Sequence, residues 1–260
     1  EQAKILFAEA EEKNLDHKAK EARFARWNTC GLCKQRYHGV VHCALGWACW
    51  KTYLGRQETD QVRGLAMTQL GNGLFGAERH EEALSVEEAD LSMMRRLGAS
   101  EADILVVQGN IANTYQYLGR LEEALLLRRE VYSGRLRRNG EEHEETLREA
   151  NNYANCLLEL RRFKEARLLL RKTILVARRL SGDGEDATLK LRWNYAQSLS
   201  KDPNATLDDV REAVTTLEET ERVARRVLGG AHPTTTNIER DLQFAREMLA
   251  AHETQSPGHS

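Results

Sequence analysis

The chain has 260 residues, of which 41% are hydrophobic and 30% charged, and its formal net charge is −2. Basic and acidic side chains nearly balance, so no net positive field exists that would attract nucleic acid. No apolar run approaches the roughly 20 residues that a membrane-spanning helix needs, and the first residues lack the apolar stretch of a signal peptide. Composition therefore argues against a nucleic-acid-binding protein and against a membrane-spanning one.

The cysteine content indicates the redox environment. The chain has five cysteines, an odd number, and Cys156 falls in a segment of helical pattern. Disulfide-stabilised proteins pair their cysteines and occur in oxidising compartments. We therefore expect an intracellular, reducing compartment, either the cytoplasm or an organelle. The first residue is not methionine, which suggests that the sequence begins inside a longer chain.

The N-terminal part, residues 1–38, combines a predicted helix with a cysteine pair. Apolar residues among Glu and Lys over residues 1–26 predict a helix with a candidate break at Asn14-Leu15-Asp16. Cys30-Gly31-Leu32-Cys33 follows it. Two thiols separated by two residues can chelate one tetrahedral zinc ion from a tight turn. Cys30 and Cys33 are therefore the metal-ligand candidates, and they form half of a site.

Residues 39–58 are predicted to be an almost wholly apolar helix followed by a linker. In such a helix Cys43 and Cys49 are expected to pack in the core and not to bind metal. His38, His42 or Cys43 would have to complete the zinc site if it closed within this chain.

The segment from Cys30 to Tyr37 resembles the closing part of a RING-CH (MARCH-type) zinc finger, in which a final Cys-x-x-Cys-Lys pair follows a tryptophan-bearing stretch. The resemblance covers about 35 residues. It implies that Cys30 and Cys33 bind zinc together with ligands that would precede residue 1. It also implies one candidate function, that of a ubiquitin ligase.

A repeat dominates the rest of the chain. Glu-Ala pairs recur at spacings of 41, 42 and 47 residues, and small residues and arginine pairs recur in the same register. The Glu-Ala pairs are Glu82-Ala83, Glu123-Ala124, Glu165-Ala166 and Glu212-Ala213, and the small residues are Gly71, Ala112, Ala154 and Ala196. A period in this range is typical of a solenoid, in which stacked helix pairs bury each other's apolar faces.

Each repeat is predicted to be two antiparallel helices. We place the repeats at residues 59–99, 100–143, 144–185 and 186–232, followed by an unpaired helix at 233–251 and a disordered tail at 253–260. Within the repeats we expect helices at residues 62–75, 80–97, 101–117, 121–138, 144–160, 163–181, 186–200 and 207–228. An insertion at Asp202-Pro203-Asn204-Ala205 lengthens the last turn and accounts for the spacing of 47 residues.

The 42-residue period and the endings Asn139-Gly140-Glu141-Glu142-His143 and Leu228-Gly229-Gly230-Ala231-His232-Pro233 resemble the kinesin light chain type of tetratricopeptide repeat. The resemblance covers roughly residues 59–250. It implies an all-α fold, a right-handed superhelical solenoid over residues 59–252, in which the first helix of each pair lines the concave groove.

Carboxamide side chains recur on one stripe of these first helices. Helical spacing places the second, sixth and ninth positions together. The resulting candidates for peptide binding are Asn72, Asn110, Asn113, Arg148, Asn152, Asn155, Lys190, Asn194 and Gln197. Asparagine is a poor helix former, so its recurrence calls for a reason. The amides either bond the backbone of an extended peptide, with Arg148 and Lys190 attracting an acidic group, or bond each other and fix the stacking of the repeats.

No motif in the sequence places a nucleophile, a base and an orienting group at catalytic spacing, and no glycine-rich phosphate loop follows a strand. We expect no cofactor other than zinc. The function predicted from the sequence is a scaffold that binds a segment of a partner protein in the groove. The alternatives are a RING-CH-type ligase whose repeats select the substrate, and a structural linker subunit of a large assembly.

Overall fold

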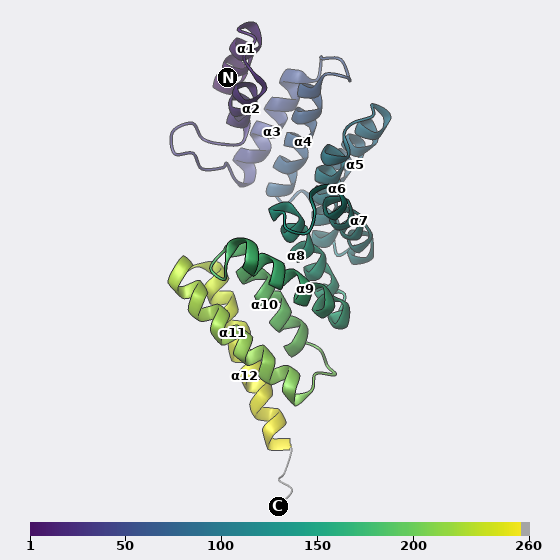
Figure 1. Cartoon of the computed structure of the whole chain (residues 1–260). Helices are drawn as coiled ribbons and strands as arrows, with labels where there is room; N and C mark the ends of the chain where they lie inside the picture. The colour runs from purple at the N-terminus through teal and green to yellow at the C-terminus, as the bar shows by residue number, and fades with distance from the viewer. Residues whose placement is uncertain (256–260) are drawn as a thin grey trace, which may run out of the picture. The chain divides into compact units, whose positions relative to one another are not determined.

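The computed structural model describes residues 1–255, which form α-helices joined by loops, the longest of them before α3 (Figure 1). In chain order the helices are α1 (Gln2–Glu12), α2 (His17–Phe24), α3 (Gly39–Tyr53), α4 (Gln61–Gly76), α5 (His80–Arg96), α6 (Glu101–Tyr117), α7 (Leu121–Asn139), α8 (Glu144–Glu159), α9 (Phe163–Ser181), α10 (Asp186–Ser200), α11 (Leu207–Leu228) and α12 (Pro233–Gln255). A single turn of 3₁₀ helix, Ala25–Trp27, follows α2. Contacts divide the chain into two units, Glu1–Leu127 and Arg128–Ser260, which we describe separately.

Local capping signals explain where the repeat helices begin and end. Ser100 accepts a hydrogen bond from the backbone N–H of Asp103 at the start of α6, and Thr206 and Asp209 form a reciprocal capping box at the start of α11. Gly229, with φ of 89°, ends α11 in a conformation that costs glycine little. These short-range signals fix the start of α6 and both ends of α11.

The first helices of the first unit surround an aromatic cluster. Phe7, Phe24, Trp27 and Tyr53 are buried, and the ring of Tyr53 lies 5.9 Å from that of Phe7 and 6.3 Å from that of Trp27. The predicted break between α1 and α2 is confirmed, since Asn14 adopts a φ of 44° and Asp16 caps α2. The N-terminal helices therefore pack on α3.

The small residues that define the repeat register are buried, as close helix crossing requires. Ala83, Ala112, Ala124, Ala154, Ala166, Ala196 and Ala213 have no exposed surface. A Cβ added at Gly71 would meet Cγ of Glu87 at 3.0 Å. The register inferred from the sequence is thus the one in which the helices pack.

The C-terminal helix is longer than the sequence suggested. α12 ends at Gln255, beyond the expected end at residue 251, so residues 253–255 are helical where we expected tail. The remainder of the expected tail, residues 256–260, lies outside the described residues. Within residues 1–255, none of the helices combines the length and the apolar character that crossing a lipid bilayer would require.

Replacing Ala166 with leucine should lower the free energy of unfolding by about 1–3 kcal/mol, because a larger side chain overpacks a close crossing. Ala166 lies at the start of α9 and has no exposed surface. Urea unfolding followed by circular dichroism measures the change. Leu168→Ala, at an exposed position of the same helix, is the control and should be nearly neutral. A leucine variant as stable as the wild type would show that the position is not a close crossing.

Candidate functional site

Two candidate asparagines in the first unit bond each other between neighbouring repeats. Nδ2 of Asn110 on α6 donates to Oδ1 of Asn72 on α4 at 3.3 Å. Both side chains are half-buried, whereas Asn113 is exposed. The Asn72–Asn110 pair therefore fits the stacking alternative that the sequence left open.

A second inter-repeat amide pair lies in the second unit. Asn194 on α10 is 6% exposed, and its Nδ2 donates to Oδ1 of Asn151 on α8 at 3.0 Å. Asn155 donates to Glu159 within α8, and Gln197 accepts from Lys201. Asn194 thus joins two repeats, and Asn155 and Gln197 bond within their own segments.

The remaining three candidates of the second unit line one pocket of about 710 Å³. Arg148 and Asn152 reach it from α8, and Lys190 reaches it from α10. Leu147 and Leu180 supply apolar surface, and the side chain of Leu180 is 46% exposed. The pocket therefore combines polar groups on the first helices of two consecutive repeats with an apolar wall.

Short-range interactions position the two helix starts at this pocket. Nδ1 of His143 accepts a hydrogen bond from the backbone N–H of Glu145 and caps α8. Gly182 ends α9 with a φ of 84°. The chain then turns, and Glu185 directly precedes α10. Consequently the first turns of α8 and α10 both face the pocket.

Several polar atoms of the pocket-lining residues have no hydrogen-bond partner among the described residues. They include Nδ2 of Asn151, Oδ1 of Asn152 and Oγ1 of Thr188. Thr188 has no exposed surface, so its hydroxyl is both buried and unpaired. The amide donor of Asn151 and the amide acceptor of Asn152 can bond the C=O and N–H groups of an extended peptide.

Sequence reasoning missed Asn151 and Thr188. Asn151 is one residue away from the predicted stripe, and Thr188 lies in the first turn of α10, where a hydroxyl residue usually indicates only a helix start. The neighbouring pair Asn151-Asn152 was the available signal, because two adjacent asparagines in a helix are unfavourable without tertiary contacts.

The basic side chains of the pocket are paired with carboxylates of their own helices. Nζ of Lys190 lies 2.6 Å from Asp186, and Arg148 lies 3.8 Å from Glu145. Glu144 and Glu185 also line the pocket, and neither has an ion-pair partner within residues 1–255. The unpaired charge of the pocket is therefore negative.

Comparison with known proteins agrees with this arrangement of helices. Residues 100–174 match the model of a tetratricopeptide repeat family. The described residues have an all-α fold of the tetratricopeptide-repeat type. A search among curated proteins finds no match to the sequence.

Solved structures of similar fold include kinesin light chain proteins. One, from Podosopora anserina, is described as having kinesin light chain nearly identical TPR-like repeats. It is 15% identical over 87% of this chain and 97% of its own, with a TM-score of 0.60. BtubC (BKLC) from P. vanneervenii is 14% identical over 84% of this chain and 92% of its own, with a TM-score of 0.61. A Rap protein complexed with Competence and Sporulation Factor is 13% identical over 96% of this chain and 65% of its own, with a TM-score of 0.55. At these identities the likeness shows the fold.

The cysteine pair that precedes the repeats lies in a tight turn. The backbone N–H of Cys30 donates to the carbonyl of Gln35 at 2.8 Å, and that of Lys34 donates to the carbonyl of Cys30 at 3.1 Å. Hydrogen bonds from the backbone amides of Cys33 and Leu32 lower the pKa of Cys30 to about 7. A turn that stabilises a thiolate fits a zinc ligand pair.

Two of the nearby residues that could complete a zinc site, His42 and Cys43, make other contacts. Nε2 of His42 lies 2.9 Å from Nε2 of Gln69, and Cys43 is buried beside Arg79. Burial also raises the pKa of Cys49 to about 12. The core positions predicted for Cys43 and Cys49 are thus confirmed. Within residues 1–255 no three His, Cys, Asp or Glu side chains are grouped so that they could hold a metal ion.

We expect residues 1–260 to bind zinc weakly, because Cys30 and Cys33 supply two of the four ligands that a structural site needs. Zinc content per chain, measured before and after treatment with a mild chelator, tests this. Cys156→Ser, which alters a buried thiol of the repeats, is the control for Cys30→Ser. Stoichiometric zinc that survives the chelator and depends on Cys30 would mean that the site closes within this chain.

Proposed function

We propose that the chain is an interaction scaffold that holds an extended segment of a partner protein in the pocket between α8 and α10. The observation that carries the proposal is the free donor of Asn151 beside the free acceptor of Asn152. An extended peptide presents a backbone N–H and a C=O at each residue, and grooves commonly bind peptides through such groups.

The apolar wall supports the same function. Leu180 is 46% exposed although it lines a concave surface, and Leu147 and Ala177 lie in the same pocket. A peptide that bonds Asn151 and Asn152 would bury an apolar side chain here, at roughly 25 cal/mol per Å² of apolar surface removed from water. The Rap protein of similar fold, which was solved as a complex with Competence and Sporulation Factor, supports ligand binding by a solenoid of this kind by analogy.

Replacing Asn152 with alanine should weaken binding of the partner about threefold to tenfold. The reason is that one hydrogen bond, which contributes about 0.5–1.5 kcal/mol, is lost. The fold should survive, because Asn152 bonds only Glu149 on its own helix and alanine is the better helix former. Proteins captured by the intact chain and identified by mass spectrometry supply the partner, and titration of that partner measures the dissociation constant.

Asn155→Ala is the matched control for this measurement. Asn155 lies on the same helix and also bonds a glutamate of that helix, but it does not line the pocket. Equal dissociation constants for the wild type and both variants would remove the pocket from the function and favour the structural-linker alternative.

The turn at Cys30 and Cys33 supports a second candidate function, that of a RING-CH-type ubiquitin ligase with the repeats as the substrate-binding part. The tight turn around the cysteine pair, in which the backbone N–H of Lys34 donates to the carbonyl of Cys30, is the observation that favours it. The proposal requires further zinc ligands outside residues 1–260. Ubiquitin transfer by the product of the longest transcript, lost in Cys30→Ser and Cys33→Ser, is the test.

A further inference from the structure

We propose that the partner segment held in the pocket between α8 and α10 is basic and directs a lysine or arginine side chain toward Glu144 and Glu185. This inference rests on the proposed function and adds the chemistry of the partner. It replaces the acidic group that the sequence alone suggested for Arg148 and Lys190.

The charges of the pocket favour a basic occupant. Four acidic side chains and two basic ones line it, a formal excess of two negative charges with His143 neutral. Lys190 is held by Asp186 at 2.6 Å, and Glu142 lies 3.9 Å from Arg179. Glu144 and Glu185 remain without an ion-pair partner within residues 1–255. An acidic segment would meet this excess, whereas a basic one would neutralise it.

Arg148 does not reverse this balance. It lies 3.8 Å from Glu145, whose carboxylate also accepts a hydrogen bond from Arg135 at 2.8 Å. Arg148 is therefore only loosely paired and adds one cation to the pocket. The carboxylates still outnumber the cations in the lining.

The unpaired hydroxyl of Thr188 is an independent sign of a ligand. Thr188 has no exposed surface, lines the pocket from α10, and its Oγ1 has no hydrogen-bond partner in the described part of the chain. A buried polar group without a partner destabilises the fold, so a side-chain movement that lets a bound group reach this hydroxyl is favoured. The hydroxyl both donates and accepts, and its oxygen can accept from an ammonium or guanidinium group.

A helix-dipole role explains the positions of the two glutamates but leaves their carboxylates available. Glu144 is the first residue of α8 and Glu185 directly precedes α10, where negative charge stabilises a helix. The side chain of Glu185 makes no capping hydrogen bond. Any test must therefore separate loss of the dipole interaction from loss of a contact with the ligand.

The test uses the full chain, residues 1–260, as bait for a displayed library of random peptides that contain equal proportions of acidic and basic residues. We expect the enriched peptides to be rich in Lys and Arg. Their affinity should fall about tenfold in the double variant Glu144→Gln with Glu185→Gln, and the effect should shrink as salt rises. Replacing the selected Lys or Arg of the peptide with glutamine should weaken binding to the wild type to a similar extent.

Glu122→Gln is the matched control, because Glu122 is an exposed acid in the first turn of α7 and does not line the pocket. It should leave the affinity unchanged, and circular dichroism should show that all variants are folded. Enriched peptides that are acidic, or that bind the double variant as tightly as the wild type, would overturn the basic-partner inference.

The outcome also separates this inference from the proposed function. Peptides that lose affinity in Asn152→Ala but not in the double glutamine variant would leave the pocket as the binding site and reject only the basic partner. Enriched peptides that are indifferent to Asn152→Ala and to both glutamates, or a library without binders, would reject both.

Discussion

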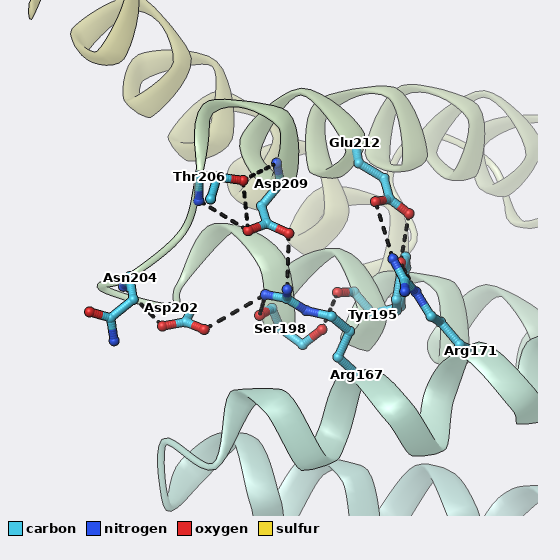
Figure 2. Close-up of polar contacts among 9 residues, drawn as sticks. All are labelled: Arg167, Arg171, Tyr195, Ser198, Asp202, Asn204, Thr206, Asp209 and Glu212. Atoms are coloured by element: carbon cyan, nitrogen blue, oxygen red, sulfur yellow. Dashed lines mark hydrogen bonds and ion pairs between the residues drawn. The ribbon is translucent and has the colours of Figure 1, made fainter.

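Replacing Arg167 with alanine should lower the free energy of unfolding by about 3 kcal/mol, because it leaves a buried carboxylate without its cation. Arg167 on α9 donates to Oδ1 of Asp209 at 2.9 Å and to the carbonyl of Ser198 at 3.1 Å, and it lies 3.7 Å from Asp202 (Figure 2). The side chain of Asp202 is only 8% exposed. Urea unfolding followed by circular dichroism measures the loss.

The position of Arg167 explains why the effect should be large. Asp202 belongs to the insertion that lengthens the fourth repeat, and its Oδ1 accepts a hydrogen bond from the backbone N–H of Asn204. Asp209 is the acidic member of the capping box that starts α11. One guanidinium on α9 thus joins the inserted loop, the end of α10 and the start of α11, as Figure 2 shows.

Arg171→Ala is the control, one turn further along the same helix. Arg171 donates to the hydroxyl of Tyr195 at 2.8 Å and lies 3.5 Å from Glu212. The side chain of Arg171 is 57% exposed and that of Glu212 is 45% exposed. Exposed pairs of this kind contribute about 0–1 kcal/mol. If both variants lost the same free energy of unfolding, the pairing of Arg167 with Asp202 would stabilise the fold no more than a surface ion pair does.

The sequence predicted the repeat helices well because short-range signals fix them. The expected bounds of residues 186–200 and 207–228 coincide with α10 and α11. Thr206 caps α11, and Gly229 ends it. The end of α12 was predicted less well, because no glycine or proline stops the chain between residue 251 and the end of the helix. Boundaries were predictable where a specific residue imposes them.

The candidate site was only partly predictable, since hydrogen-bond partners depend on how repeats stack. The stripe identified Asn110 and Asn152 alike, but Asn110 bonds Asn72 whereas Asn152 lines a pocket. The two asparagines occupy equivalent repeat positions, so the repeat pattern alone does not distinguish them. Arg167 and Thr188 were missed for the same reason, because their roles arise from contacts between segments that are distant in sequence.

Replacing Glu87 with glutamine should stabilise the first unit at pH 8 while changing its stability little near pH 4. Glu87 on α5 is 4% exposed and accepts a hydrogen bond from Thr114 at 2.8 Å. Burial raises the pKa of Glu87 to about 7 from its ordinary value of 4.5, and the nearby Asp90 carboxylate adds to the shift. Burial likewise raises the pKa of Asp90 to about 6.

The direction of the pH dependence follows from these raised pKa values. Between pH 4.5 and about 7 the folded chain retains a proton on Glu87 that the unfolded chain releases. The free energy of unfolding therefore falls as pH rises through this window, and above it the buried carboxylate is charged and destabilising. Glutamine remains neutral at every pH and removes this contribution.

The variant should consequently gain stability relative to the wild type as pH rises, by on the order of 3 kcal/mol between pH 4 and pH 8. Urea unfolding at several pH values, with circular dichroism as the probe, measures the difference between the two proteins. Glu88→Gln is the control, because Glu88 is exposed and bonds the hydroxyl of Tyr115. It should show no such trend with pH. If the difference for Glu87→Gln were also constant between pH 4 and pH 8, the carboxyl of Glu87 would titrate in the folded chain as it does in water, and burial would not keep it protonated.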